Sequence, residues 1–197
     1  GDDTLDKINA YCKEHDVSCV FENVDMERDP HIIKYPGSRV FLLDIVSNDM
    51  KFQKLSFEEM CTVAESLKIP HKELGYEIET WQDFFDWYNR VMDEDYKYGG
   101  RRIEGFVIED SNGYMVKLKL AYYNFWKFMR SISHEAIKKG YIDPKRTAAL
   151  VTPLANQFYA WVKTLHDVED LDSVPRNICT LRDMFYESDS GKKFKDE

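Results

Sequence analysis

The sequence predicts an α+β fold, in which an antiparallel-sheet part over residues 1–120 is followed by an all-helical part over residues 121–197. Three observations support this prediction. Before residue 120, apolar and polar residues alternate in several short runs, as they do in half-buried strands. Asn112-Gly113 lies between two such runs and is a strong signal for a hairpin of antiparallel strands. After Leu120 the apolar residues recur at helical spacing.

The elements of the first part follow from spacing and from cap residues. We expect helices over residues 2–15, 56–69 and 80–96, and strands over 17–24, 31–35, 38–48 and 74–79. Ser56 followed by Glu59 is a capping-box signature for the second helix, and Pro70 ends it. Thr80 is the expected N-cap of the third helix.

The second part is predicted to contain helices over residues 121–140, 143–168 and 173–188, the middle one interrupted near Pro153. Gly140 marks the end of the first of these helices. Its aromatic tract either stacks on bases or packs between the hairpin and the helical tail, and the helical spacing favours packing. The tract comprises Tyr122, Tyr123, Phe125, Trp126 and Phe128.

Charge and composition limit the classes of protein and of partner. The formal net charge is −9, yet residues 101–146 carry ten basic and five acidic side chains. Such a segment either focuses an anionic ligand or forms a solvated surface, and the sequence leaves both open. No apolar run approaches the roughly 20 residues that cross a bilayer, so no membrane partner is expected. The four cysteines lack metal-ligand spacing, which is typical of reduced thiols in a cytoplasmic protein.

The hairpin around Asn112-Gly113 carries charges among apolar residues. If these two residues form the loop, Ile108 opposes Lys117 and Phe106 opposes Lys119. Because side chains alternate, one face then carries Glu104, Phe106, Ile108, Lys117 and Lys119. The other face, with Ile103, Val107, Val116, Leu118 and Leu120, is the better core face. The charges are therefore expected to be segregated on one side of the hairpin.

Two lysines beside a carboxylate can form a compact anion site. A phosphate between Lys117 and Lys119 would gain charge-assisted hydrogen bonds, and Glu104 could hold a divalent cation that also contacts that phosphate. The alternative is a partly exposed sheet face with ordinary cross-strand ion pairs, which the hairpin alone favours because such faces are common.

Two segments resemble motifs of phage-type ATP-dependent RNA ligases, members of the covalent nucleotidyltransferase superfamily. "SCVFENVDMERDPHIIKYPGSRVFLLDI" resembles motif III and the strands after it. "EGFVIEDSNGYMVKLKL" is similar to motifs IV and V, in which a K-x-K strand follows an E-G-F/Y-V run. The motifs stand in family order, and the resemblance covers about residues 15–130.

The resemblance implies a role for each matching residue. Glu22 would be the motif III acid near the ribose, and Glu104 the motif IV acid that helps to place Mg²⁺ or Mn²⁺. Lys117 and Lys119 would contact the AMP phosphate. The expected reaction joins RNA 5′-phosphate and 3′-hydroxyl ends with ATP, through lysine–AMP and RNA-adenylate intermediates; tRNA is one candidate substrate. Residues 1–120 would be the C-terminal part of the adenylyltransferase domain, and residues 121–197 a helical C-terminal domain.

One departure from the family pattern bears on activity. The family's nucleophile lies in a Lys-x-Asp-Gly motif before motif III, and this sequence contains none; Lys72 to Gly75 reads "KELG" and follows motif III. We therefore expect a missing N-terminal part of the same polypeptide and no self-adenylation by this chain. The alternatives are a catalytically inactive RNA-binding module of the same fold, or a DNA ligase or capping-type nucleotidyltransferase. A helical tail in place of an OB-fold strand pattern disfavours the last two.

Overall fold

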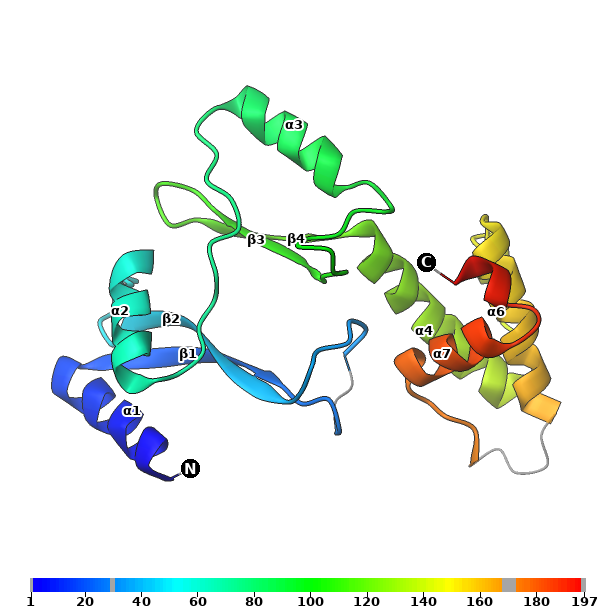
Figure 1. Ribbon diagram of the computed structural model, residues 1–197, viewed down its shortest axis with the longest axis horizontal. Coiled ribbons are helices and arrows are strands. Elements are labelled where there is room, and N and C mark those ends of the chain that lie inside the picture. Colours follow the sequence, from blue (N-terminus) through cyan, green and yellow to red (C-terminus); the bar gives the residue numbers. More distant parts are fainter. Residues whose placement is uncertain (1, 29–30, 168–172, 196–197) are drawn as a thin grey trace. The chain divides into compact units, whose positions relative to one another are not determined.

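The computed structural model describes residues 2–28, 31–167 and 173–195, and it confirms the α+β class (Figure 1). The chain forms two compact units. The first comprises Gly1–His31 and Tyr35–Glu79, and the second comprises Ile32–Lys34 and Thr80–Glu197. Each contains one two-stranded antiparallel sheet. Each unit is described below by itself.

The first unit packs two helices on one face of a sheet. Its elements are α1 (Asp2–His15), β1 (Val17–Val24), β2 (Arg39–Ser47) and α2 (Phe57–Leu67). A buried cluster of Leu42, Ile45, Met60 and Ala64 joins β2 to α2, and residues of α1 and β1 pack against it. The predicted capping box is present, since Ser56 accepts from the Glu59 amide while Glu59 accepts from the Ser56 amide.

A cluster of charges holds two later segments of the first unit on β2. Asp44 Oδ1 accepts from Lys54 Nζ at 3.4 Å and from Lys72 Nζ at 2.9 Å, and the Asp44 side chain is only 14% exposed. Leu42 bonds through its backbone to Pro70 and Lys72. Burying a carboxylate is unfavourable unless its charge is paired. Both lysines pair with Asp44, so these contacts hold the segments around Lys54 and Lys72 against β2.

Two predicted strands are absent. Residues 31–35 do not join a sheet, because Ile32 and Ile33 are buried at 2% and 5% exposure and the Ile32 carbonyl accepts from Arg182 and Cys179. Residues 74–79 are also irregular. Leu74 and Tyr76 remain exposed, so a strand there would bury no apolar face.

The second unit begins with a helix and the hairpin. These are α3 (Trp81–Val91), β3 (Gly105–Glu109) and β4 (Met115–Lys119). Thr80 caps α3 as predicted, accepting from the Asp83 amide. The helix ends at Val91, earlier than expected, where the Asp93 carboxylate accepts from the Asp95 amide and so stabilises a turn.

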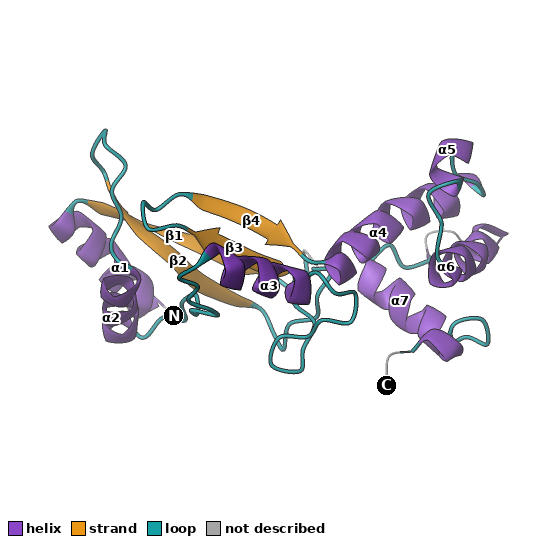
Figure 2. Ribbon diagram, turned by 90° about the horizontal axis from the view of Figure 1, so that it is seen from above, coloured by secondary structure: helices purple, strands orange, loops and turns teal. Residues whose placement is uncertain are grey.

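The tail is helical, as predicted. Among its described residues it contains α4 (Ala121–Lys139), α5 (Pro144–Thr147), α6 (Pro153–Thr164), α7 (Ile178–Glu187) and the short 3₁₀ helices Leu165–Asp167 and Lys192–Phe194. Helices α6 and α7 lie beside α4 (Figure 2). Gly140 adopts φ 75° at the end of α4, and Pro153 is the first residue of α6.

Aromatic rings form the centre of the helical core. The Trp126 and Phe158 ring centroids are 5.3 Å apart and those of Phe158 and Phe185 are 5.2 Å apart, both pairs edge to face. All three side chains are fully buried. The other four rings of the aromatic tract pack against this core, which confirms the packing interpretation.

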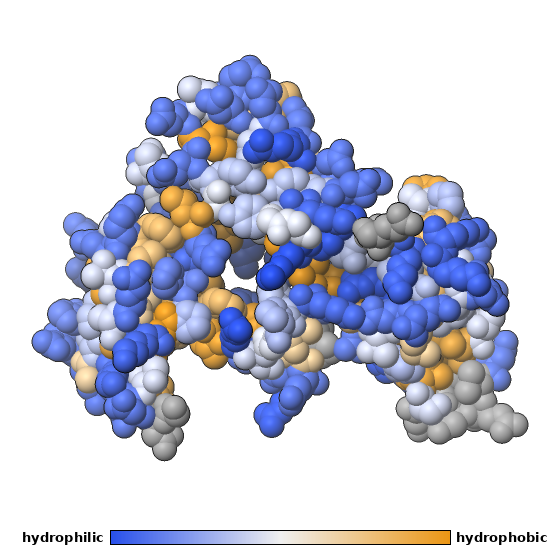
Figure 3. Space-filling model, in the orientation of Figure 1, coloured by the Kyte–Doolittle hydropathy of each residue, from blue (hydrophilic) through white to orange (hydrophobic). Residues whose placement is uncertain are grey.

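Hydrophilic residues dominate the face that Figure 3 displays, with smaller hydrophobic patches between them. Within the described residues, no helix combines the length and the apolar character that a membrane span requires. The four cysteines are free thiols. Cys12 donates to Cys19 across 3.5 Å, and burial, together with that contact, raises the pKa of the Cys19 thiol to about 12.

Candidate functional site

The turn of the β3–β4 hairpin has three residues, Ser111 to Gly113. The Gly113 amide donates to the Asp110 carbonyl at 2.9 Å, and Gly113 adopts φ 81°. The Asp110 carboxylate accepts from the amides of Asn112 and Tyr114, each at 2.9 Å. A glycine in the left-handed region at the third position is typical of a three-residue hairpin loop, so the Asp110 side chain and Gly113 together set the loop length.

This loop corrects the predicted register. Val107 pairs with Lys117 and Gly105 pairs with Lys119, whereas the two-residue loop would have placed Ile108 and Phe106 opposite these lysines. An odd loop length reverses the grouping of one strand relative to the other. Lys117 and Lys119 therefore share a face with Val107 rather than with Phe106 and Ile108, and we call this side of the hairpin the lysine face.

The opposite face of the hairpin is the packed one. Phe106 pairs with Leu118, and its ring lies 5.4 Å from the Trp87 ring of α3. Rings of Tyr96 and Tyr98 contact Phe106 as well. On the lysine face, by contrast, the Val107 side chain is 61% exposed. Helix α3 thus covers the Phe106 side and leaves the lysine face accessible within this unit.

Glu104 contacts Lys119 although the register differs from the predicted one. Lys119 Nζ donates to Glu104 Oε1. Glu104 precedes β3, so strand alternation does not fix its direction, and its carbonyl accepts from the Leu120 amide at 3.1 Å. Gly105 permits this close approach of β3 to β4, because a Cβ there would lie 1.9 Å from the Leu118 carbonyl oxygen.

Tyr123, in the first turn of α4, completes the contact. Lys119 Nζ lies 4.9 Å from the centre of the Tyr123 ring. Burial raises the pKa of the Tyr123 hydroxyl, and the negative charge of Glu104 and a hydrogen bond to its carboxylate raise it further. Sequence reasoning assigned Tyr123 only to packing or stacking. Tyr123 follows Lys119 by four residues, and this spacing is the sequence signal that could have suggested the contact. The four residues span a strand-to-helix junction, however, and the spacing does not define the geometry of that junction.

The two remaining predicted site residues form no part of the Glu104–Lys119 contact. Lys117 is exposed on the lysine face and has no ion pair within the part of the chain that the structure describes. Glu22 pairs with Phe41 in the first unit and is also exposed, without an ion pair among the described residues. Of the four residues, the structure brings together Glu104 and Lys119.

The donor set fits a phosphate-bound divalent cation better than a metal site made of protein ligands alone. In residues 2–28, 31–167 and 173–195, no three His, Cys, Asp or Glu side chains gather as a metal site. Glu104 offers one carboxylate, and Mg²⁺ commonly binds through one or two carboxylates together with substrate phosphates. A carboxylate has about four lone-pair sites, so the contacts with Lys119 and Tyr123 leave room for a cation.

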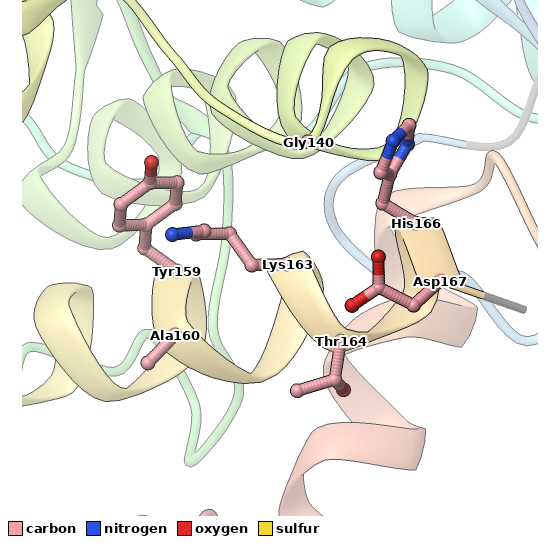
Figure 4. A pocket seen from close by; sticks show the side chains of 7 residues that line it. All are labelled: Gly140, Tyr159, Ala160, Lys163, Thr164, His166 and Asp167. Atoms are coloured by element: carbon pink, nitrogen blue, oxygen red, sulfur yellow. The ribbon is translucent and has the colours of Figure 1, made fainter.

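A hollow lies in the helical tail, away from the hairpin contact in the chain (Figure 4). Its volume is about 390 Å³, and Tyr159 and Lys163 of α6 and His166 and Asp167 of the following 3₁₀ helix line it, with Gly140, Ala160 and Thr164. His166 bonds to the Ile137 carbonyl at 2.8 Å, and its ring fills the space beside Gly140, where a Cβ would lie 2.7 Å from the imidazole. The imidazole therefore closes the C-terminal end of α4, a structural role.

Gly105→Ala tests the close approach of β3 to β4 at this glycine. The added Cβ would overlap the Leu118 carbonyl, so we expect the free energy of unfolding to fall by about 1–3 kcal/mol in urea titrations. Gly37→Ala is the matched control, because a Cβ at Gly37 meets no atom within 4 Å. Equal stability of the two variants would contradict the close approach of the two strands.

Glu104→Gln tests the contact with Tyr123. Removing the negative charge should lower the pKa of Tyr123 toward its ordinary value, while burial keeps it above that value. The measurement is an NMR titration of ¹³C-labelled tyrosine, with Tyr123→Phe to assign the signal. Glu135→Gln, on the same helix as Tyr123, is the control and should leave the pKa of Tyr123 unchanged. If Glu104→Gln also left that pKa unchanged, the contact would be refuted.

Comparison with known families adds an independent finding. A family model described as RNA ligase matches residues 1–123, a range that holds both sheets and ends at Tyr123. A search of curated proteins found no match. Because the family match covers more than half of the 197 residues and includes the whole Glu104–Lys119–Tyr123 contact, this chain belongs to the RNA ligase family.

Proposed function

We propose that the chain is part of an ATP-dependent RNA ligase that joins RNA 5′-phosphate and 3′-hydroxyl ends. The observation that carries the proposal is the contact of Lys119 with Glu104 and Tyr123, on a hairpin whose accessible face also presents Lys117. The chain belongs to the RNA ligase family. In such a protein, a strand lysine that is held in place by a carboxylate is suited to binding a nucleotide phosphate.

The proposed reaction has three steps at phosphorus. A lysine amine attacks the α-phosphorus of ATP, releasing pyrophosphate and leaving AMP on the lysine. An oxygen of the RNA 5′-phosphate then displaces the lysine, which gives RNA-adenylate. Finally an RNA 3′-hydroxyl attacks that 5′-phosphate and releases AMP. Each step increases negative charge around the phosphorus under attack, so cations fixed in advance lower its barrier.

In this proposal Lys117 and Lys119 contact the AMP phosphate, and Glu22 lies near the ribose. Glu104 has two tasks: it orients the Lys119 ammonium, as its ion pair supports, and it would hold Mg²⁺ or Mn²⁺. When bound, the cation would supply Lewis-acid stabilisation of phosphate oxygens. Preorganisation of this kind avoids reorganising solvent during the reaction.

The domain assignment and setting are part of the same proposal. Residues 1–120 would be the C-terminal part of the adenylyltransferase domain and residues 121–197 a helical domain, in a cytoplasmic enzyme that acts on RNA ends, tRNA among them. No Lys-x-Asp-Gly sequence occurs in the 197 residues, and we therefore assign the nucleophile to a further, N-terminal part of the polypeptide.

The missing motif generates the first test. Incubation of this chain with α-³²P-labelled ATP and Mg²⁺ should yield no protein-linked AMP on a denaturing gel, because no lysine lies in the required motif. An RNA ligase that contains the motif serves as the positive control. A labelled band from this chain would disprove the assignment of the nucleophile.

The second test concerns the lysine face. In the ligase that combines these residues with a Lys-x-Asp-Gly lysine, replacing both Lys117 and Lys119 with Ala should slow RNA sealing on the order of 10²-fold or more. Lys13→Ala with Lys51→Ala removes two exposed lysines of the first unit and should retain activity. Undiminished sealing by the Lys117/Lys119 variant would exclude the phosphate role.

A second candidate is a catalytically inactive RNA-binding module of the same fold, which the missing motif favours. The same experiments separate it from the ligase. An inactive module would bind RNA but would seal no ends, even when a segment carrying Lys-x-Asp-Gly is supplied.

A further inference from the structure

Helix α4 continues from the lysine face and carries a row of basic side chains. Lys127, Arg130, His134 and Lys138 follow one another at intervals of three or four residues, which places them on one side of the helix. Lys127, His134 and Lys138 are exposed and Arg130 is partly exposed. We call this row the α4 basic row.

The other side of α4 is committed to the core. Trp126, Met129, Ile132, Ala136 and Ile137 are buried against α6 and α7. The basic row therefore lies on the other side of α4 from this packing surface, although His134 Nε2 bonds to the Arg176 carbonyl, just before α7, at 2.9 Å. Its charges contribute nothing to that core, and cations three and four residues apart repel one another and weaken an isolated helix.

Carboxylates do not neutralise the row. Glu135 is the acidic residue of α4, and its oxygens accept from Lys139 at 3.2 Å and from Arg146 at 2.6 Å. These hydrogen bonds hold the pKa of Glu135 below its usual range. Lys127 and Lys138 have no carboxylate partner within the described residues. The row is cationic in a chain whose formal net charge is −9.

The row is continuous with the candidate site. The Tyr123 ring lies 4.9 Å from Lys119 Nζ and 5.9 Å from Lys127 Nζ, measured to its centroid. Tyr123 thus links the last residue of β4 to the first cation of the row. From Lys127 to Lys138 the helix rises by about 16 Å, at ~1.5 Å per residue.

We infer that the α4 basic row binds the phosphodiester backbone of the RNA substrate and leads the strand away from the lysine face. A linear series of cations that starts at a phosphate site matches the linear charge of a polynucleotide. The absence of large apolar side chains from the row disfavours a membrane surface as the occupant. This inference rests on the proposed function, because it takes the strand's reacting 5′-phosphate to lie beside the AMP phosphate that Lys117 and Lys119 contact.

The test compares two double variants of equal charge change. Lys127→Ala/Lys138→Ala removes two cations of the row, and Lys13→Ala/Lys51→Ala removes two exposed lysines of the first unit. Binding of fluorescein-labelled, 5′-phosphorylated single-stranded RNA is followed by fluorescence anisotropy at several salt concentrations. Circular dichroism should show that both variants remain folded, since all four side chains are exposed.

For the row variant we expect affinity to fall about tenfold at low salt, and the slope of log K against log salt to become shallower by about 1.4, or ~0.7 for each lost phosphate contact. The control variant should match the wild-type chain. Equal slopes in all three proteins, an equal loss in the control, or no RNA binding by the wild-type chain would overturn the inference. So would equally tight competition by poly-glutamate, which would indicate a site for acidic protein.

A second readout separates this inference from the proposed function. In the complete ligase, the row variant should raise the KM for RNA and leave formation of lysine–AMP unchanged. Normal sealing by the row variant, together with loss of sealing by the Lys117/Lys119 variant, would reject the row and retain the function. Normal sealing by the Lys117/Lys119 variant would reject the phosphate role of these two lysines even if the row binds RNA.

Discussion

The turn at Asp110 to Tyr114 is the constraint on which the candidate site depends. Its side-chain bonds and the left-handed Gly113 give a three-residue loop, and this loop fixes which residue of β3 lies opposite each residue of β4. With one residue fewer, the lysines would share a face with Phe106, whose ring packs on α3. The observed register packs the aromatic side on α3 and leaves the cations accessible within their unit, as the proposed contact with a phosphate requires.

Sheet and helix are joined at a short junction that is itself well packed. Leu120 is 3% exposed, forms the N-cap of α4 and bonds back to Glu104, while Tyr123 contacts both members of the Glu104–Lys119 pair. A charged pair tied to strand, helix and ring has little freedom to reorient. Such rigidity suits the proposed role of this pair, because the geometry is then set before the substrate arrives.

The distribution of charge along the chain is also consistent with an anionic ligand at the hairpin. The chain is acidic overall, but the hairpin and α4 together present cations on accessible surfaces, and the acid of α4 is already paired. A local positive potential within an acidic protein favours an anion at that place over non-specific binding elsewhere. The helical core on the opposite side of α4, built from Trp126, Phe158 and Phe185, supports this surface without using its charges.

The sequence by itself determined the features that depend on neighbours in the chain: the capping box of Ser56 and Glu59, the end of α4 at Gly140 and the presence of a hairpin. It also predicted that Glu104 and Lys119 meet, although from a register one residue off. Tertiary structure decided the rest. Ile32 leaves a predicted strand because its carbonyl is bound by Arg182, 150 residues later, and Tyr123 reaches Lys119 only through the angle between strand and helix. Such contacts depend on how distant segments pack, and local spacing and propensity carry no information about that packing.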